Sequence, residues 1–256
     1  MIVLLAVIAF PAPAAAEQAS QPDAPAAGRI DVSGGGATTC AVLDDNNVRC
    51  WGFGADGRPG YANTETIGDN ETPASAGPVD LSPPGGPQRS AKALSVGTAP
   101  TCALLDDASV RCWGFGGDGR LGYANTETIG DNETPGSAGP VYLGPTGGPQ
   151  RSAKAISAGG AHSCAVLDDD SVRCWGFGGD GRLGYGNTEP IGDNETPGPV
   201  GPVDLSPPGG PQRSAKAISA GQNHTCALLD DNSVRCWGVG ATGRLGYGNT
   251  DVVGDN

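Results

Sequence analysis

Short apolar runs alternate with polar and turn residues along most of the chain. In the clearest example, the runs CAVL (164–167) and SVRC (171–174) flank Asp168, Asp169 and Asp170. Asp and Asn tolerate the left-handed conformation that a three-residue hairpin loop needs at its last position. The pattern therefore predicts a β-hairpin with Asp170 at that position.

This hairpin has a definite register. With Leu167 opposite Ser171, the facing pairs are Val166 with Val172, Ala165 with Arg173 and Cys164 with Cys174. The cysteines then occupy a non-hydrogen-bonded site, where Cα atoms lie about 4.5 Å apart. That separation suits a cross-strand disulfide.

Two other segments have strand patterns. AKAISAG occurs at 153–159 and 215–221, and GPVDL occurs at 201–205. Gly- and Pro-rich segments join them, so we expect about four short strands in each unit.

The pattern repeats every 62 residues. The first cysteine of the hairpin recurs at this step, as do the second cysteine and the tryptophan after it: Cys40, Cys102, Cys164, Cys226; Cys50, Cys112, Cys174, Cys236; Trp51, Trp113, Trp175, Trp237. The repeat units are about 29–90, 91–152, 153–214 and 215–256. The third loop position is Asn46, Ala108 and Asn232 in the other copies. The chain is therefore a repeat protein.

The period favours one disulfide pairing among the many that eight cysteines permit. It joins the cysteines of each hairpin: Cys40–Cys50, Cys102–Cys112, Cys164–Cys174 and Cys226–Cys236. Small buried thiols in a cytosolic protein are the alternative. The C-x9-C spacing and the presence of only two histidines disfavour zinc.

Composition and charge exclude some folds and disfavour some partners. Gly (44) and Pro (22) exclude a helical bundle, and their period makes them the turn residues of repeated strands. The net charge of -13 and a pI near 4.4 argue against nucleic acid or an anionic membrane as partner.

The N-terminus has the pattern of an export signal. Residues 2–10 are apolar but too short to span a bilayer, and small residues follow. We predict a signal peptide at 1–16 and a flexible leader at 17–28, hence an extracellular or cell-surface protein without membrane insertion after signal removal. The first basic residue is Arg29, so the usual basic start is missing. An uncleaved lipid anchor or a buried strand remains the alternative.

Short strands at this period predict an all-β fold, a β-propeller with one blade per unit, with a solenoid as the alternative. The segment HTCALLDDNSVRCWGVGATGRLGYGN (224–249) resembles the repeat of the regulator of chromosome condensation family, whose fold is a seven-bladed propeller. The resemblance covers residues 29–256. The closer resemblance is to secreted bacterial members with a cysteine pair per repeat, whose best understood relative is a β-lactamase-inhibiting propeller that binds its target through one face.

The family's eukaryotic founder promotes nucleotide exchange on a small GTPase at chromatin. It is not an acidic, secreted, cysteine-paired protein, so we do not expect exchange activity here. Residues 29–256 hold about 3.7 units, which is short of seven blades. We expect an incomplete ring, a fragment of a longer array with exposed edges. A four-bladed ring and completion by oligomerisation are the alternatives.

The sequence contains few candidate catalytic or metal-binding residues. His162 and His224 share a register that Thr38 and Pro100 hold in the first two units, so no repeated histidine site exists. No nucleophile motif or sialidase box is present, and the turn carboxylates are matched by copies 62 residues away. The Asp-rich turns lack the Ca²⁺-loop motif and are interpreted as solvated, although they leave calcium binding open. We therefore predict no enzyme, no cofactor and no metal site.

The tryptophans are interpreted as blade core, with a sugar or peptide groove as the alternative. The predicted function is non-enzymatic binding of an unknown protein or glycan through the long loops between blades. Two residues of each loop are the candidates for contact: Tyr61, Asn63, Tyr123, Asn125, Tyr185, Asn187, Tyr247 and Asn249. The alternatives are an accessory domain or remnant of a secreted hydrolase and a purely structural surface array.

Overall fold

A computed structural model describes residues 31–256 and confirms the all-β fold. Each repeat forms one antiparallel sheet of three strands, in chain order. The strands are β1 (Asp31–Gly34), β2 (Thr38–Val42), β3 (Val48–Gly52), β4 (Ala91–Val96), β5 (Pro100–Leu105), β6 (Val110–Gly114), β7 (Ala153–Ala158), β8 (His162–Leu167), β9 (Val172–Gly176), β10 (Ala215–Ala220), β11 (His224–Leu229) and β12 (Val234–Gly238).

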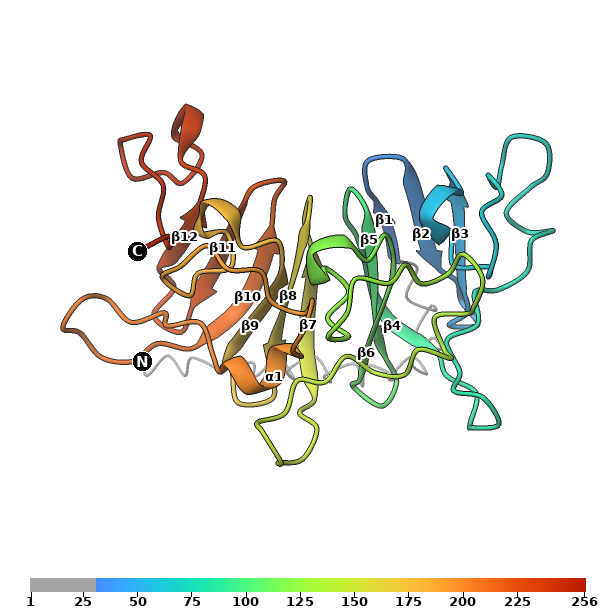
Figure 1. Ribbon diagram of the computed structural model, residues 1–256, viewed down its shortest axis with the longest axis horizontal. Coiled ribbons are helices and arrows are strands. Elements are labelled where there is room, and N and C mark those ends of the chain that lie inside the picture. The colour runs from blue at the N-terminus through green and yellow to red at the C-terminus, as the bar shows by residue number, and fades with distance from the viewer. Residues whose placement is uncertain (1–30) are drawn as a thin grey trace, which may run out of the picture.

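The four sheets stand side by side in chain order, as the blades of an open arc (Figure 1). Contacts between neighbouring blades join β2 to β4, β5 to β7 and β8 to β10. The first and fourth blades lie at opposite ends of the row in Figure 1. The described chain is therefore an incomplete propeller.

Between residues 31 and 256, helical structure is limited to single turns. Each blade is followed by a 3₁₀ turn: η1 (Ala55–Gly57), η2 (Gly117–Gly119), η3 (Gly179–Gly181) and η4 (Ala241–Gly243). The one α-helical turn between residues 31 and 256 is α1 (Pro197–Val200). Within this range, none of these turns has the length or apolar character that crossing a membrane requires.

The predicted hairpin register is confirmed in all four blades. In the third blade, Val166 faces Val172 and Cys164 faces Cys174. A disulfide joins each predicted pair, with Cα atoms 4.0–4.1 Å apart. The third loop residue is left-handed in every copy, with φ of 60°, 63°, 63° and 68° at Asn46, Ala108, Asp170 and Asn232.

The prediction of about four strands per unit is wrong, because GPVDL forms no strand. Residues 201–205 make a single ladder-like bond, from Val203 N–H to the Val172 carbonyl at 2.9 Å. Pro202 has no N–H to donate, and the Asp204 carboxylate accepts the Ser206 N–H in a local turn. Val203 and Leu205 are nevertheless buried, so the segment closes the outer side of the blade without joining its sheet.

The predicted signal peptide (1–16) and leader (17–28) lie outside the described residues.

Candidate functional site

A tryptophan packs each blade against the one before it. Trp113, Trp175 and Trp237 are 0%, 0% and 3% exposed, as predicted for core residues. A Cβ added to Gly60, Gly122 or Gly184 of the preceding blade would lie only 2.7–2.9 Å from the indole Nε1. Glycine is therefore required where the loop of one blade crosses the tryptophan of the next.

Trp51 has no preceding blade among residues 31–256 and is only half-buried. Its exposure comes from the position of its blade in the arc, since the local hairpin is the same in all four copies.

In the first three long loops, an arginine packs against a phenylalanine ring at the surface. The guanidinium carbon of Arg120 lies 4.8 Å from the centre of the Phe115 ring, and its Nη2 lies 2.6 Å from the Asp118 carboxylate. The same triplet recurs in the first and third repeats: Phe53, Asp56, Arg58 and Phe177, Asp180, Arg182. The arginines are largely buried, whereas the aspartates are exposed at their tips.

The phenylalanines remain partly in solvent. Phe53, Phe115 and Phe177 are 48%, 38% and 38% exposed, and the fourth repeat has Val239 at this position. The sequence prediction does not include them, although their recurrence after three of the four Trp-Gly pairs is a usable signal. Together these three rings form a repeated surface feature, which we call the phenylalanine row.

The candidate tyrosines use their hydroxyl groups within their own blades. The hydroxyl of Tyr123 accepts the Cys112 N–H at 3.1 Å and donates to the Gly139 carbonyl at 3.2 Å. Tyr61, Tyr185 and Tyr247 accept the same bond from the second cysteine of their repeats. Burial raises the pKa of Tyr123 and of Tyr185 to about 12. These rings tie each long loop to its hairpin.

The candidate asparagines shape the loops. The Asn63 side chain accepts the Glu65 N–H and donates to the Tyr61 carbonyl, and its own N–H reaches the Gly130 carbonyl of the next blade at 3.1 Å. Asn125, Asn187 and Asn249 make the corresponding local turn. A contact between these residues and a partner stays a prediction.

A cavity of about 360 Å³ opens in the first long loop, and Tyr61, Asn63, Glu65 and Glu71 line part of it. It brings together two of the predicted contact residues and two carboxylates. A second hollow of about 380 Å³ follows the turns between the first two strands of the blades, and Gly35, Gly97, Gly159 and Gly221 line part of it.

Negative charge is concentrated in the long loops. Segments 53–76, 115–138, 177–200 and 239–256 contain 14 carboxylates and four arginines, whereas the rest of residues 31–256 contains 12 carboxylates and ten basic side chains. Burial and the neighbouring Asp131 raise the pKa of Glu133, and the same causes act on Glu195 beside Asp193. The loops therefore form the acidic part of the molecule.

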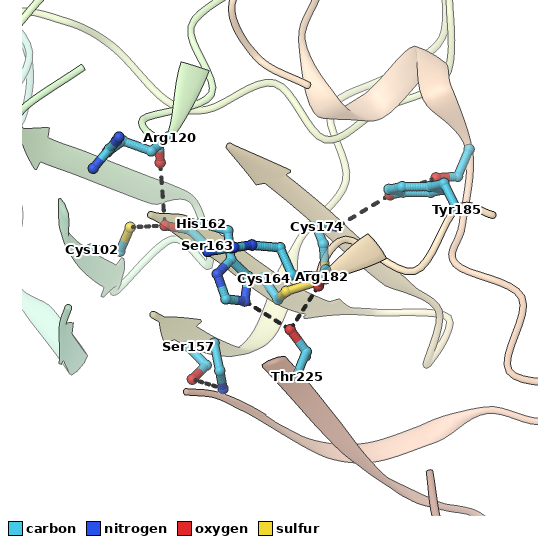
Figure 2. Close-up of a disulfide and its surroundings, with 12 residues drawn as sticks. Cys102, Arg120, Ser157, His162, Ser163, Cys164, Cys174, Arg182, Tyr185 and Thr225 are labelled. Carbon is cyan, nitrogen blue, oxygen red and sulfur yellow. Dashed lines mark hydrogen bonds between the residues drawn. A yellow bond between two sulfur atoms is a disulfide. The ribbon is translucent and has the colours of Figure 1, made fainter. Parts of the chain in front are cut away.

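His162 is a buried structural residue. Its Nε2 lies 2.8 Å from Oγ1 of Thr225 in the next blade, and Thr225 donates to the Arg182 carbonyl at 3.0 Å (Figure 2). Burial lowers the pKa of His162 to about 3, so it is neutral at physiological pH. Ser163 makes a similar bond to the Arg120 carbonyl of the preceding blade. Residues 31–256 contain no group of three or more His, Cys, Asp or Glu side chains arranged to hold a metal.

These features define a repeat propeller with one disulfide inside each blade, and comparison with known proteins supports the propeller fold. Models of the regulator of chromosome condensation (RCC1) repeat match residues 30–58, 153–182, 215–243 and 169–228. The chain therefore carries RCC1 repeats, and each of its four repeats has its own cysteine pair.

Curated relatives share a limited level of identity. The ultraviolet-B receptor UVR8 of Arabidopsis thaliana is 29% identical over 219 residues, which are 85% of this chain and 43% of the receptor. The human E3 ubiquitin-protein ligase HERC2 is 28% identical over 222 residues, which are 87% of this chain and 4% of the ligase. The chain thus spans less than half the length of these relatives.

Solved structures show the same fold. Human WBSCR16 matches with a TM-score of 0.63 and 20% identity, over 93% of this chain and 53% of that structure. Prp20p from Saccharomyces cerevisiae matches with a TM-score of 0.60 and 16% identity, over 90% of this chain and 50% of that structure. Prp20p has binding properties toward Gsp1p and histones.

Proposed function

We propose that this protein is a non-enzymatic binding module, secreted or held at the cell surface, that presents its long loops to a partner protein with a basic surface. The observation that carries this proposal is the charge distribution: 14 carboxylates against four arginines in the loops, and near balance elsewhere in residues 31–256. Complementary charge steers partners together and selects among them.

The phenylalanine row supplies the apolar part of such a surface. Each ring contacts an arginine that pairs with an exposed aspartate of the same repeat, so aromatic and acidic groups recur at blade spacing. Rigid blades hold these groups in place, and several weak contacts to one partner add through avidity. The histone binding of yeast Prp20p, which shares this fold, is consistent with a basic protein as partner.

The disulfides support the proposed location outside the cytosol. Four cross-strand bridges, with no free cysteine among the described residues, are typical of proteins that fold in an oxidising compartment.

The observations give less support to two other functions. An accessory domain or remnant of a hydrolase would need carboxylates or histidines in distinct environments, whereas Glu133 and Glu195 occupy equivalent ones. A purely structural array would give no saturable binding.

The test measures binding of a captured extracellular partner to the immobilised chain as a function of salt. In the triple variant E65Q/E127Q/E189Q, exposed side chains without hydrogen-bond partners in the described structure lose their charge. We expect weaker binding and a smaller dependence on salt, whereas E65D/E127D/E189D retains both. Salt-independent binding that survives the Gln variant would exclude a basic partner and favour a neutral glycan. Absence of saturable binding would support the structural array.

A further inference from the structure

The third repeat holds its phenylalanine ring in a fixed setting. The guanidinium carbon of Arg182 lies 4.8 Å from the centre of the Phe177 ring. A Cβ added to Gly179 would overlap the ring, so a side chain there would displace it. Arg182 is fixed in turn, because its Nε donates to the Gly179 carbonyl at 2.8 Å and its Nη1 donates to Oδ1 of Asn223, in the next blade, at 2.9 Å. The ring is therefore in place before a partner binds.

The other repeats show what this setting depends on. The first repeat has Ala55 in place of the glycine. There the distance from arginine to ring is 5.5 Å instead of 4.8 Å, and Phe53 is 48% exposed instead of 38%. The fourth repeat has Val239, Ala241 and Thr242 in place of Phe, Gly and Asp. Only the second and third repeats of residues 31–256 have the complete set, which we call a shelf: Phe115, Gly117, Asp118, Arg120 and Phe177, Gly179, Asp180, Arg182.

The arginine that packs on each ring also binds an aspartate. Arg120 and Arg182 are 10% and 5% exposed, whereas their partners Asp118 and Asp180 are 47% and 50% exposed, so each shelf presents the carboxylate to solvent and buries the guanidinium. A carboxylate has about four acceptor positions, and the arginine Nη2 occupies one of them. Each exposed carboxylate can therefore accept a second cation.

The two shelves lie on neighbouring blades and on the same side of the molecule. Each directly follows the third strand of its blade, and η2 and η3, which contain Asp118 and Asp180, lie at the upper ends of the blades in Figure 1. Packed sheets stand about 10 Å apart, and an extended chain advances about 3.3 Å per residue. Side chains of one extended segment that reach both shelves must therefore be at least three positions apart.

We propose that each shelf binds a lysine or arginine side chain from one extended basic segment of the partner. The apolar stem of such a side chain covers the phenylalanine ring while its charged end reaches the aspartate, so one residue satisfies both parts of the shelf. The excess of carboxylates in the long loops favours a basic segment over a neutral or acidic one. This inference rests on the proposed function, because it assumes a basic partner, and it names the residues that bind that partner.

The experiment uses a fluorescent Gly-Ser peptide that carries two lysines, made with spacers of increasing length, and measures its binding to the whole chain by anisotropy. We expect saturable binding that is strongest at one spacer length, because the second contact adds affinity only when the spacer spans both shelves. Acetylation of both lysines should abolish it, because it removes the charge. The proposal is overturned if no lysine peptide binds saturably, if acetylated peptides bind equally well, or if spacer length has no effect.

Substitutions separate the shelves from charge in general. The double variant F115V/F177V places the valine of the fourth repeat in both shelves. It should weaken binding of the best peptide about tenfold at unchanged net charge. Asp118→Asn should weaken binding severalfold, and asparagine tolerates the left-handed backbone at this position, where φ is 59°. Asp44→Asn is the matched control: Asp44 is exposed in the hairpin loop at the opposite end of its blade, so its replacement should leave peptide binding unchanged.

Failure of this inference is distinguishable from failure of the proposed function. If E65Q/E127Q/E189Q weakens binding of the basic partner while F115V/F177V leaves peptide binding unchanged, the loops act through charge alone and the shelves are not the site. If F115V/F177V weakens peptide binding while the Gln variant keeps full, salt-independent partner binding, the shelves bind cations and the proposed function fails. Circular dichroism of each variant establishes that loss of binding is not loss of folding.

Discussion

The Nε2 atom of His162 lies 2.8 Å from Oγ1 of Thr225, across the junction between the third and fourth blades. Thr225 gives its proton to the Arg182 carbonyl, so the imidazole must donate through Nε2–H and leave Nδ1 unprotonated. The Nδ1 atom is buried without a partner among the described residues. This junction therefore depends on a neutral histidine.

Acid should weaken the fold through His162. Its pKa is about 3 in the folded chain and 6.5 in a model peptide. Above pH 6.5 the residue is neutral in both states; below it, only the unfolded chain binds the proton. The free energy of unfolding then falls by about 1.4 kcal/mol per pH unit until pH approaches 3.

Urea unfolding at pH 7 and pH 5 checks this expectation. His162→Gln should lose about 2 kcal/mol less than the unmodified chain between the two pH values. His224→Gln is the matched control, because His224 is only partly buried. Its replacement should alter the pH dependence of unfolding less than the replacement of His162 does. Equal pH dependence in the unmodified chain and His162→Gln would contradict the assignment.

Ala108 is strained in its hairpin loop. It has φ of 63°, where the other repeats place Asn or Asp. This conformation costs about 1–2 kcal/mol for alanine and less for asparagine, because the asparagine side chain bonds locally. Ala108→Asn should therefore raise the free energy of unfolding by about 0.5–1 kcal/mol, and Asn232→Ala should lower it by a similar amount. Chemical denaturation measures both; no change in either variant would argue against strain at this position.

The glycines that cross the tryptophans should tolerate no side chain. Gly122→Ala adds a Cβ 2.9 Å from Nε1 of Trp175, whereas Gly139→Ala, at nearly the same φ, meets nothing within 4 Å. The left-handed backbone conformation destabilises both alanine variants. The difference between their free energies of unfolding therefore measures the cost of the steric overlap between the added Cβ and the indole, which we expect to be about 1–3 kcal/mol. Equal thermal unfolding temperatures in the two variants would show that the blades adjust at no cost.

Non-reducing peptide mapping should recover four local bridges, each within one hairpin. Replacing both Cys164 and Cys174 with serine should lower the free energy of unfolding by about 2–3 kcal/mol. Bridges between different repeats, or eight free thiols, would refute the pairing.

The hairpins were predictable because their signals are local. The register from Leu167 to Ser171, the left-handed third position and the cysteine pairs all follow from residues within eleven positions of one another. Pro202 and Asp204 are equally local signals against a strand. The apolar alternation of GPVDL nevertheless predicts a fourth strand, which does not form.

The candidate site was harder to predict because its contacts cross between blades. The bond from Ala158 N–H to Ser95 spans 63 residues, and no pattern within one repeat indicates it. Their place in long loops predicts the tyrosines as contact residues, whereas in the structure the hydroxyl groups of Tyr123 and Tyr185 bind the hairpins of their own blades. The sequence does not show whether the phenylalanine row is buried, and the exposed fractions of its rings in the folded chain place it at the surface.

Within residues 31–256, the repeated junctions also determine which blades open first. The second and third blades each pack against two neighbours, whereas the first and fourth pack against one among residues 31–256. In a linear array whose stability is the sum of units and nearest-neighbour contacts, the outer units open at lower free energy than the inner ones. Backbone amides of β5 and β8 should exchange with solvent deuterium more slowly than those of β2 and β11, so the arc frays from its two ends toward its middle.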